Sequence, residues 1–159
     1  MTSTITSAKL KVTITEFVKL KGKDQGATTE LTIQDINEIS SRIVTITSAE
    51  ATIATFSSAV ASAGHYVAAD VRYMRFTNLD DTNFITLTFR NQDNDEVAIK
   101  LDAGLSFIWN GDNNNGMTAV FNATEDADAA SDTAFGSLTN IQADANTASC
   151  DLEIFIASA

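Results

Sequence analysis

Apolar and polar residues alternate with a period of two along most of the chain, which is the pattern of β-strands with one buried face. Leu10, Val12 and Ile14 alternate with lysines and threonines, and Phe17, Val18 and Leu20 then break the phase as a bulge or bend would. In the last strand Phe155 is an apolar exception, because it lies opposite the apolar face of that strand. The alternation predicts a β protein.

Turn-forming residues divide this pattern into about nine or ten short strands. The strands include 9–15, 28–34, 42–47, 51–56, 71–76, 85–90, 97–101 and 149–157. Residues 71–76 and 85–90 flank the polar turn 78–83, so we expect them to form an antiparallel hairpin. Residues 35–41 are compatible with one helical turn, and 57–69 with a loop or short helix.

These elements predict an all-β fold, either a two-sheet sandwich or a barrel, and we favour an antiparallel two-sheet sandwich that is jelly-roll-like. We find no amphipathic helix of about ten or more residues, which argues against long βαβ crossovers. Neither an internal repeat nor a linker is evident, so we expect one domain over residues 1–159. Within it, residues 1–26 are candidates for an extended N-terminal arm plus the first strand.

Composition excludes several classes of partner. With 21 acidic against 10 basic side chains the net charge is −11, which argues against nucleic acid and anionic membranes as partners. The first residues lack the basic and apolar regions of a signal peptide, and the longest apolar runs are only a few residues. We therefore expect a soluble protein made in a cytoplasm.

The charge is unevenly distributed along the chain. Five lysines fall in the first segment (Lys9, Lys11, Lys19, Lys21 and Lys23), whereas residues 102–159 carry nine carboxylates and no lysine or arginine. Complementary patches of this kind can register two copies of a protein head to tail. The alternative is that solvent-facing strand surfaces carry whichever charge keeps the protein soluble.

Catalytic chemistry has few candidates in the sequence, and we expect no enzyme activity and no cofactor. His65 is the single histidine, and we interpret it as a surface loop residue; we interpret Cys150, the single cysteine, as a small core residue. No phosphate-binding glycine loop, Cys/His metal spacing or serine-nucleophile motif is present. No pair among the acids is singled out for glycoside hydrolysis.

Two further kinds of site are considered from the residue types. Side chains with oxygen atoms that could bind calcium are grouped at Asp93, Asp95 and Glu96, and at Asp112 with Asn114. Neither group has the spacing of a calcium loop. Four aromatic residues could line a sugar site, but aromatics at alternating strand positions are more commonly core residues. They are Tyr73, Phe84, Phe107 and Trp109.

Three segments carry a resemblance: 72–87 (RYMRFTNLDDTNFITL), 98–104 (AIKLDAG) and 151–156 (DLEIFI). In these segments the sequence resembles small virion structural proteins of tailed bacteriophages. Those proteins share a layout of strand, Thr-Asn-Leu-Asp, strand and Leu-x-Ala/Pro-Gly, with Ala103 here at the Ala/Pro position. The resemblance implies a β-sandwich without enzymatic activity that serves as a building block of the virion, assembled in the host cytoplasm.

Two locations in the particle are compatible with this resemblance. We favour a capsid decoration or cement protein bound to the major capsid protein, because the chain is short and lacks the repeats or helical stalk of many fibres. A tail or fibre component is the alternative, and a free carbohydrate-binding module is a third interpretation. In each virion role other virion proteins and further copies of the chain would be the partners.

The expected interface combines the five lysines with two polar loops. The lysines would meet an acidic surface, and the loops 78–83 and 110–116 would supply contacts at one end of the sandwich. The loop residues are Asn78, Asp80, Asp81, Asn83, Asp112 and Asn114. Strand edges are also candidates for pairing between copies, because the chain has no proline to block them.

Overall fold

The computed structural model describes residues 6–58, 62–110 and 138–159, and within them the chain is all-β with no helix. It has thirteen strands in these ranges. They are β1 (Ala8–Thr15), β2 (Lys19–Leu20), β3 (Lys23–Asp24), β4 (Thr28–Ile36), β5 (Glu38–Ile46), β6 (Ala51–Ser57), β7 (His65–Val67), β8 (Val71–Asn78), β9 (Ile85–Asn91), β10 (Glu96–Leu101), β11 (Ser106–Asn110), β12 (Leu138–Ala145) and β13 (Cys150–Ser158).

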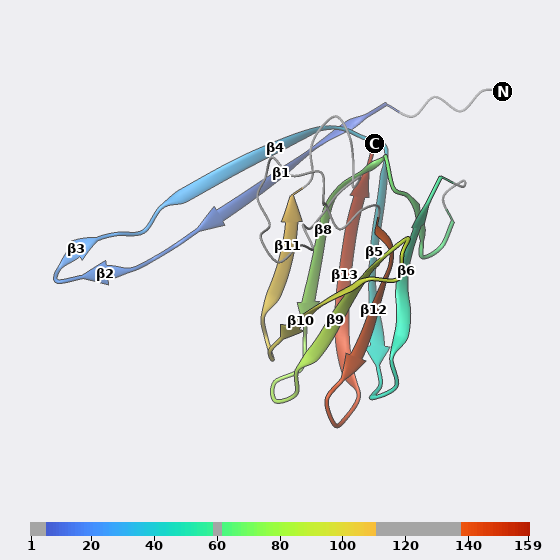
Figure 1. Ribbon diagram of the computed structural model, residues 1–159. Helices are drawn as coiled ribbons and strands as arrows, with labels where there is room; N and C mark the ends of the chain where they lie inside the picture. Colours follow the sequence, from blue (N-terminus) through green and yellow to red (C-terminus); the bar gives the residue numbers. More distant parts are fainter. Residues whose placement is uncertain (1–5, 59–61, 111–137) are drawn as a thin grey trace.

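Two larger sheets form the body of the molecule (Figure 1). One has the strand order β11-β8-β13-β5, and the other has the order β10-β9-β12-β6-β7. All neighbours are antiparallel except β6 and β7, which run parallel. The all-β class expected from the alternation is therefore confirmed.

A common hydrophobic core lies between these two sheets. Its largest fully buried side chains come from the central strands of both, with Phe76 and Leu152 on one side and Phe89 and Ile141 on the other. The period of two places these residues on the inner faces, because successive side chains of a strand point to opposite sides. Cys150 is buried in this core, as expected.

The prediction that residues 71–76 and 85–90 form an antiparallel hairpin is wrong. β8 pairs with β11 and β13, whereas β9 lies in the other sheet between β10 and β12. Residues 79–84 thus cross from one sheet to the other. Alternation predicts which face of a strand is buried, but it carries no information on which strand lies beside it.

The helical turn considered for residues 35–41 is also wrong, because β4 ends at Ile36 and β5 begins at Glu38. A bulge in β4 next to Asp35, which has a φ of 57°, shifts the strand phase. Ile33 and Ile36, three residues apart, can therefore both point to the same buried side. Residues 57–69 likewise contain the short strand β7.

The N-terminal part of the described chain forms a long hairpin that projects from the body (Figure 1). We call residues 8–36 the arm; β1 pairs with β4 along its length, and β2 with β3 near its end. The arm is longer than the 1–26 segment considered from the sequence.

The arm is attached through a second hydrophobic cluster on the outer face of the β8–β13 sheet. Ile33 and Ile36 of the arm are buried there with Tyr73 of β8 and Ala157 of β13. The rings of Tyr73 and Phe155 meet edge to face at 5.9 Å, and Leu10, Val12 and Leu31 pack against the cluster. We call this contact the root of the arm. It explains why Phe155 interrupts the polar outer face of β13.

We predict that Ile33→Ala detaches the root without unfolding the body. Truncating a buried isoleucine costs about 2–5 kcal/mol, which corresponds to about 30-fold or more in an opening equilibrium. Native-state hydrogen exchange should therefore be about 30-fold or more faster for the amides of Leu10 to Val12, while those of β13 facing β5 keep wild-type rates. Equal acceleration in both places would show that the arm and the body unfold together. Leu152→Ala, in the common core, is the control that should accelerate both.

Candidate functional site

The five lysines singled out from the sequence all lie on the arm, and all are exposed. Lys9 and Lys11 are on β1, Lys19 on β2 and Lys23 on β3, with Lys21 in the turn between β2 and β3. Lys11 forms an ion pair of 2.8 Å with Glu30 across the β1–β4 ladder. The ion pairs of the described residues include none of the other four, so their charge is available to a partner.

The outer end of the arm is apolar as well as basic. We call residues 14–27 the tip; within it Ile14, Phe17, Val18 and Leu20 are exposed, Phe17 by 91%. Monomeric proteins rarely group large apolar side chains on a surface without a use for them. These are the residues whose phase break suggested a bulge from the sequence.

The tip has a defined shape despite its exposure. Lys21 and Gly22 both have positive φ, as the two central residues of a tight hairpin turn require. The amide of Gln25 donates to the carbonyl of Val18, and that of Glu16 to the carbonyl of Ala27. A Cβ at position 26 would lie 2.0 Å from the Glu16 carbonyl oxygen, so only glycine fits where the two sides of the hairpin approach each other.

The loop 78–83 is held by its own polar side chains. Asn78 is fully buried; its Nδ2 donates to the carbonyls of Asn83 (2.8 Å) and Leu101 (3.1 Å), and its Oδ1 accepts from the amide of Asp80. The Asp80 carboxylate accepts from the amides of Thr82 (2.8 Å) and Asn83 (2.6 Å). These bonds lower the pKa of the Asp80 carboxyl.

This loop is also tied to its neighbours at the same end of the body. The amide of Leu79 donates to the carbonyl of Asp151, and the Thr147 hydroxyl donates to Asn83 Oδ1. We call residues 78–84, which carry the chain from one sheet to the other, the corner. The side chains of Asn78 and Asp80 hold the corner in shape, while Asp81 is exposed at its surface. Asp112 and Asn114, the other loop residues considered, lie outside the described residues.

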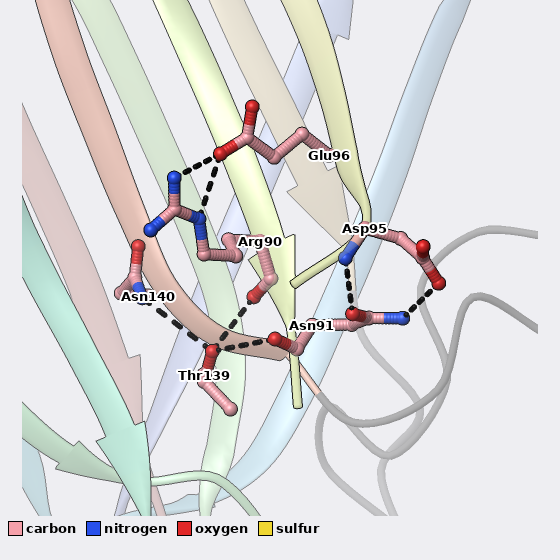
Figure 2. A network of polar contacts seen from close by, with 6 residues as sticks. All are labelled: Arg90, Asn91, Asp95, Glu96, Thr139 and Asn140. Carbon is pink, nitrogen blue, oxygen red and sulfur yellow. Dashed lines mark hydrogen bonds and ion pairs between the residues drawn. The ribbon is translucent and has the colours of Figure 1, made fainter. Parts of the chain in front are cut away.

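Asp95 and Glu96, two of the carboxylates considered for calcium, have protein partners (Figure 2). Glu96 pairs with the guanidinium of Arg90, and Asp95 accepts from Asn91 Nδ2 at 3.1 Å. Asn91 Oδ1 in turn accepts from the amides of Asp93 and Asp95, which shapes the turn between β9 and β10. Within the described residues no group of three potential metal-ligating side chains is present.

His65 and Ser57 make a contact of the kind found in catalytic sites, with Nε2 and Oγ 2.6 Å apart. The two residues lie at either end of the three-residue pairing between β6 and β7. The contact therefore joins the two strands. Burial raises the pKa of the Cys150 thiol, which disfavours the reactive thiolate.

Two grooves accompany these surfaces. One of about 480 Å³ lies between β5 and β6, where the Arg42 guanidinium donates to the carbonyl of Ile53 and so bridges the two sheets. The other, of about 260 Å³, lies beneath the root of the arm beside Tyr73, Arg75 and Phe155. Arg75 is held there by an ion pair of 2.6 Å with Glu153.

β5 presents a surface that sequence reasoning missed. It is an edge strand of nine residues, and Ile39 and Ile43 are exposed on its outer face, by 56% and 62%. Carboxylates lie near them: Asp151 and Glu153 are on the outer face of the neighbouring β13, opposite Thr45 and Ile43, while Glu38 begins β5 and Glu50 lies in the turn just before β6. We call Ile39, Ile43 and these four carboxylates the β5 patch. The sequence signal was the pair of isoleucines out of phase with Val44 and Ile46.

Comparison of the chain with protein-family models, with curated proteins and with solved structures found no match. Among the described residues, no helix is long and apolar enough to cross a membrane. The arm, the loop 78–83 and the β5 patch are therefore the features of the described residues that bear on function.

We predict that the Asp80 carboxylate contributes pH-dependent stability to the corner. Because its pKa is lowered on folding, this contribution is present above the unfolded value of about 3.9 and is lost as pH falls through the folded pKa. Asp80→Asn should therefore lower Tm at pH 7, and its difference from wild type should shrink in thermal scans below about pH 4. The control is Asp81→Asn, whose carboxylate accepts from the Thr82 hydroxyl and should cost less at pH 7. A difference for Asp80→Asn that is constant from pH 7 to pH 2.5 would contradict the prediction.

Proposed function

We propose that this chain is a non-enzymatic structural component of a bacteriophage virion, and specifically a capsid decoration or cement protein that stabilises contacts between capsomers. The observation that carries the proposal is the arm: a preformed hairpin with an exposed apolar and basic tip, projecting from the body. Such an element suits attachment to a neighbouring subunit. By burying surface on two neighbours at once, a cement protein adds its own contacts to those that must break when capsomers separate.

We further propose that the body is a jelly-roll sandwich. Its strand orders, β5-β13-β8-β11 and β6-β12-β9-β10, support this, with β7 as an added edge strand. Within the described residues five links join strands of opposite sheets, namely β5 to β6, β7 to β8, β8 to β9, β10 to β11 and β12 to β13. Jelly rolls are a recurrent architecture of viral capsid proteins, although lectin domains and cupins share them.

Two segments that carry the resemblance to phage virion proteins are hydrogen-bonded to each other in the structure. The Thr-Asn-Leu-Asp stretch, Thr77 to Asp80, includes the buried Asn78 that binds the carbonyl of Leu101 at the start of the Leu-x-Ala-Gly corner. The amide of Gly104 donates to the carbonyl of Asn78. Two of the three segments that carry the resemblance thus form one hydrogen-bonded unit.

A tail or fibre component is the alternative location, and the arm suits it equally. The carbohydrate-binding interpretation has less support, because Phe17 is the one strongly exposed aromatic residue among those described. Tyr73 is buried, and Phe107 and Trp109 pack against the common core.

We expect an antibody against this chain to label gradient-purified phage particles on the shell. Immunogold electron microscopy of a lytic culture that produces the protein is the measurement, and a cytosolic protein of the same host is the control. Label on the tail would replace the decoration role with the alternative one. A chain found only in the soluble fraction would overturn both roles.

Reversing the charge of the five arm lysines to glutamate should reduce incorporation into particles by about tenfold or more, since like charges across an interface slow encounter and weaken the complex. The measurement is the amount of chain per particle by quantitative mass spectrometry after expression of the variant. Reversal of Lys100, which lies on β10 in the body, is the single-site control. Unchanged incorporation at low salt would remove the lysines from the mechanism.

A further inference from the structure

We propose that the tip of the arm docks on the β5 patch of a second copy of this chain, so that copies associate head to tail. This inference deepens the proposed function and depends on it only for where assembly takes place. The partner of the tip is thus a second copy of the chain itself.

The chemistry of the two surfaces is complementary. The tip presents Phe17, Val18 and Leu20 among three unpaired lysines, Lys19, Lys21 and Lys23. The β5 patch presents two exposed isoleucines beside Asp151 and Glu153 on the same face, with Glu38 and Glu50 close to the two ends of β5 along the chain. An apolar centre with a charged rim is the usual organisation of a protein interface, and opposite rim charges favour encounter.

The charges near β5 leave little to oppose the lysines. Arg42, on β5 itself, is half-buried and turned to the Ile53 carbonyl of the neighbouring β6. Arg75 is paired with Glu153, which leaves Glu38, Glu50 and Asp151 as unpaired carboxylates of the patch within the described residues. Glu16 and Asp24 reduce the net charge of the tip, but Asp24 accepts from the amide of Gly26 and is part of the turn.

The fold places the tip and the β5 patch on opposite sides of one molecule. In the sheet β11-β8-β13-β5, the strand β5 forms one edge, and the arm extends past the other edge, beyond β11 (Figure 1). A tip therefore cannot reach the β5 patch of its own body, whereas a copy placed beside β11 presents its β5 edge toward the arm. Such a contact is heterologous and generates rings or filaments, the forms that repeat in a particle.

β5 also suits docking as a strand. It has no proline and no lysine, and its edge away from β13 has no strand partner among the described residues. An edge of this kind is open to strand addition, which most native proteins prevent.

Two variants with defects on opposite surfaces test the proposal. Phe17→Asp damages the tip, and Ile43→Lys damages the patch, both at exposed positions where folding tolerates a charge. In sedimentation velocity over a concentration series, each variant should associate about tenfold or more weakly than wild type, the effect of removing a central interface contact. Ala98→Lys, at an exposed position of β10 in the other sheet, is the control and should associate as wild type does.

Mixing the two variants gives the sharper result. The intact arm of Ile43→Lys fits the intact patch of Phe17→Asp, so an equimolar mixture should form a dimer of twice the 17.0 kDa monomer mass and stop there. A mixture that stays monomeric, or an Ile43→Lys variant that associates like wild type, would overturn the proposal in favour of tip-to-tip contact or another acceptor. Thermal unfolding of each variant confirms that it is folded.

The proposed function fails independently of this test. A wild-type chain that is monomeric at about 1 mM, yet labels phage particles, would show that the tip binds a different virion protein. A chain that associates head to tail but is absent from particles would support this inference and overturn the virion role.

Discussion

The burial of side chains between two sheets is the interaction on which the rest of this molecule depends. β8 and β13 supply Phe76 and Leu152 from one side, and β9 and β12 supply Phe89 and Ile141 from the other. Because a strand has only two faces, committing one face to this core leaves the other for solvent or for a partner. The outer faces and the edges therefore carry the features that distinguish this protein.

The arm uses one such outer face. Tyr73 and Phe155 are apolar exceptions on otherwise polar surfaces, and together with Ile33 they hold the root. A hairpin alone is marginally stable in water, so this contact orders the base of the arm and fixes the direction in which the tip points. At the opposite end of the body, the Asn78 and Asp80 side chains hold the corner that carries the chain from one sheet to the other.

Sequence reasoning predicted the faces of the strands well and their neighbours poorly. The inward positions of Met74, Phe76, Leu152 and Ile154 follow from period-two alternation, and the structure has them buried. The pairing of β8 with β13 joins residues more than seventy positions apart, and nothing in a local pattern encodes it. The lysines were recognised as a group, but their common location depends on the pairing of β1 with β4, which the alternation of Leu10 and Val12 left open.

The shape of the tip has a consequence for the thermodynamics of association. A disordered segment must lose conformational entropy when it binds, which weakens the complex even when the contacts are good. Here the positive φ at Lys21 and Gly22 and the close approach at Gly26 restrict the backbone before any partner arrives. More of the contact energy of Phe17 and its neighbours then appears as affinity, so that a small contact area suffices when it is repeated around an assembly.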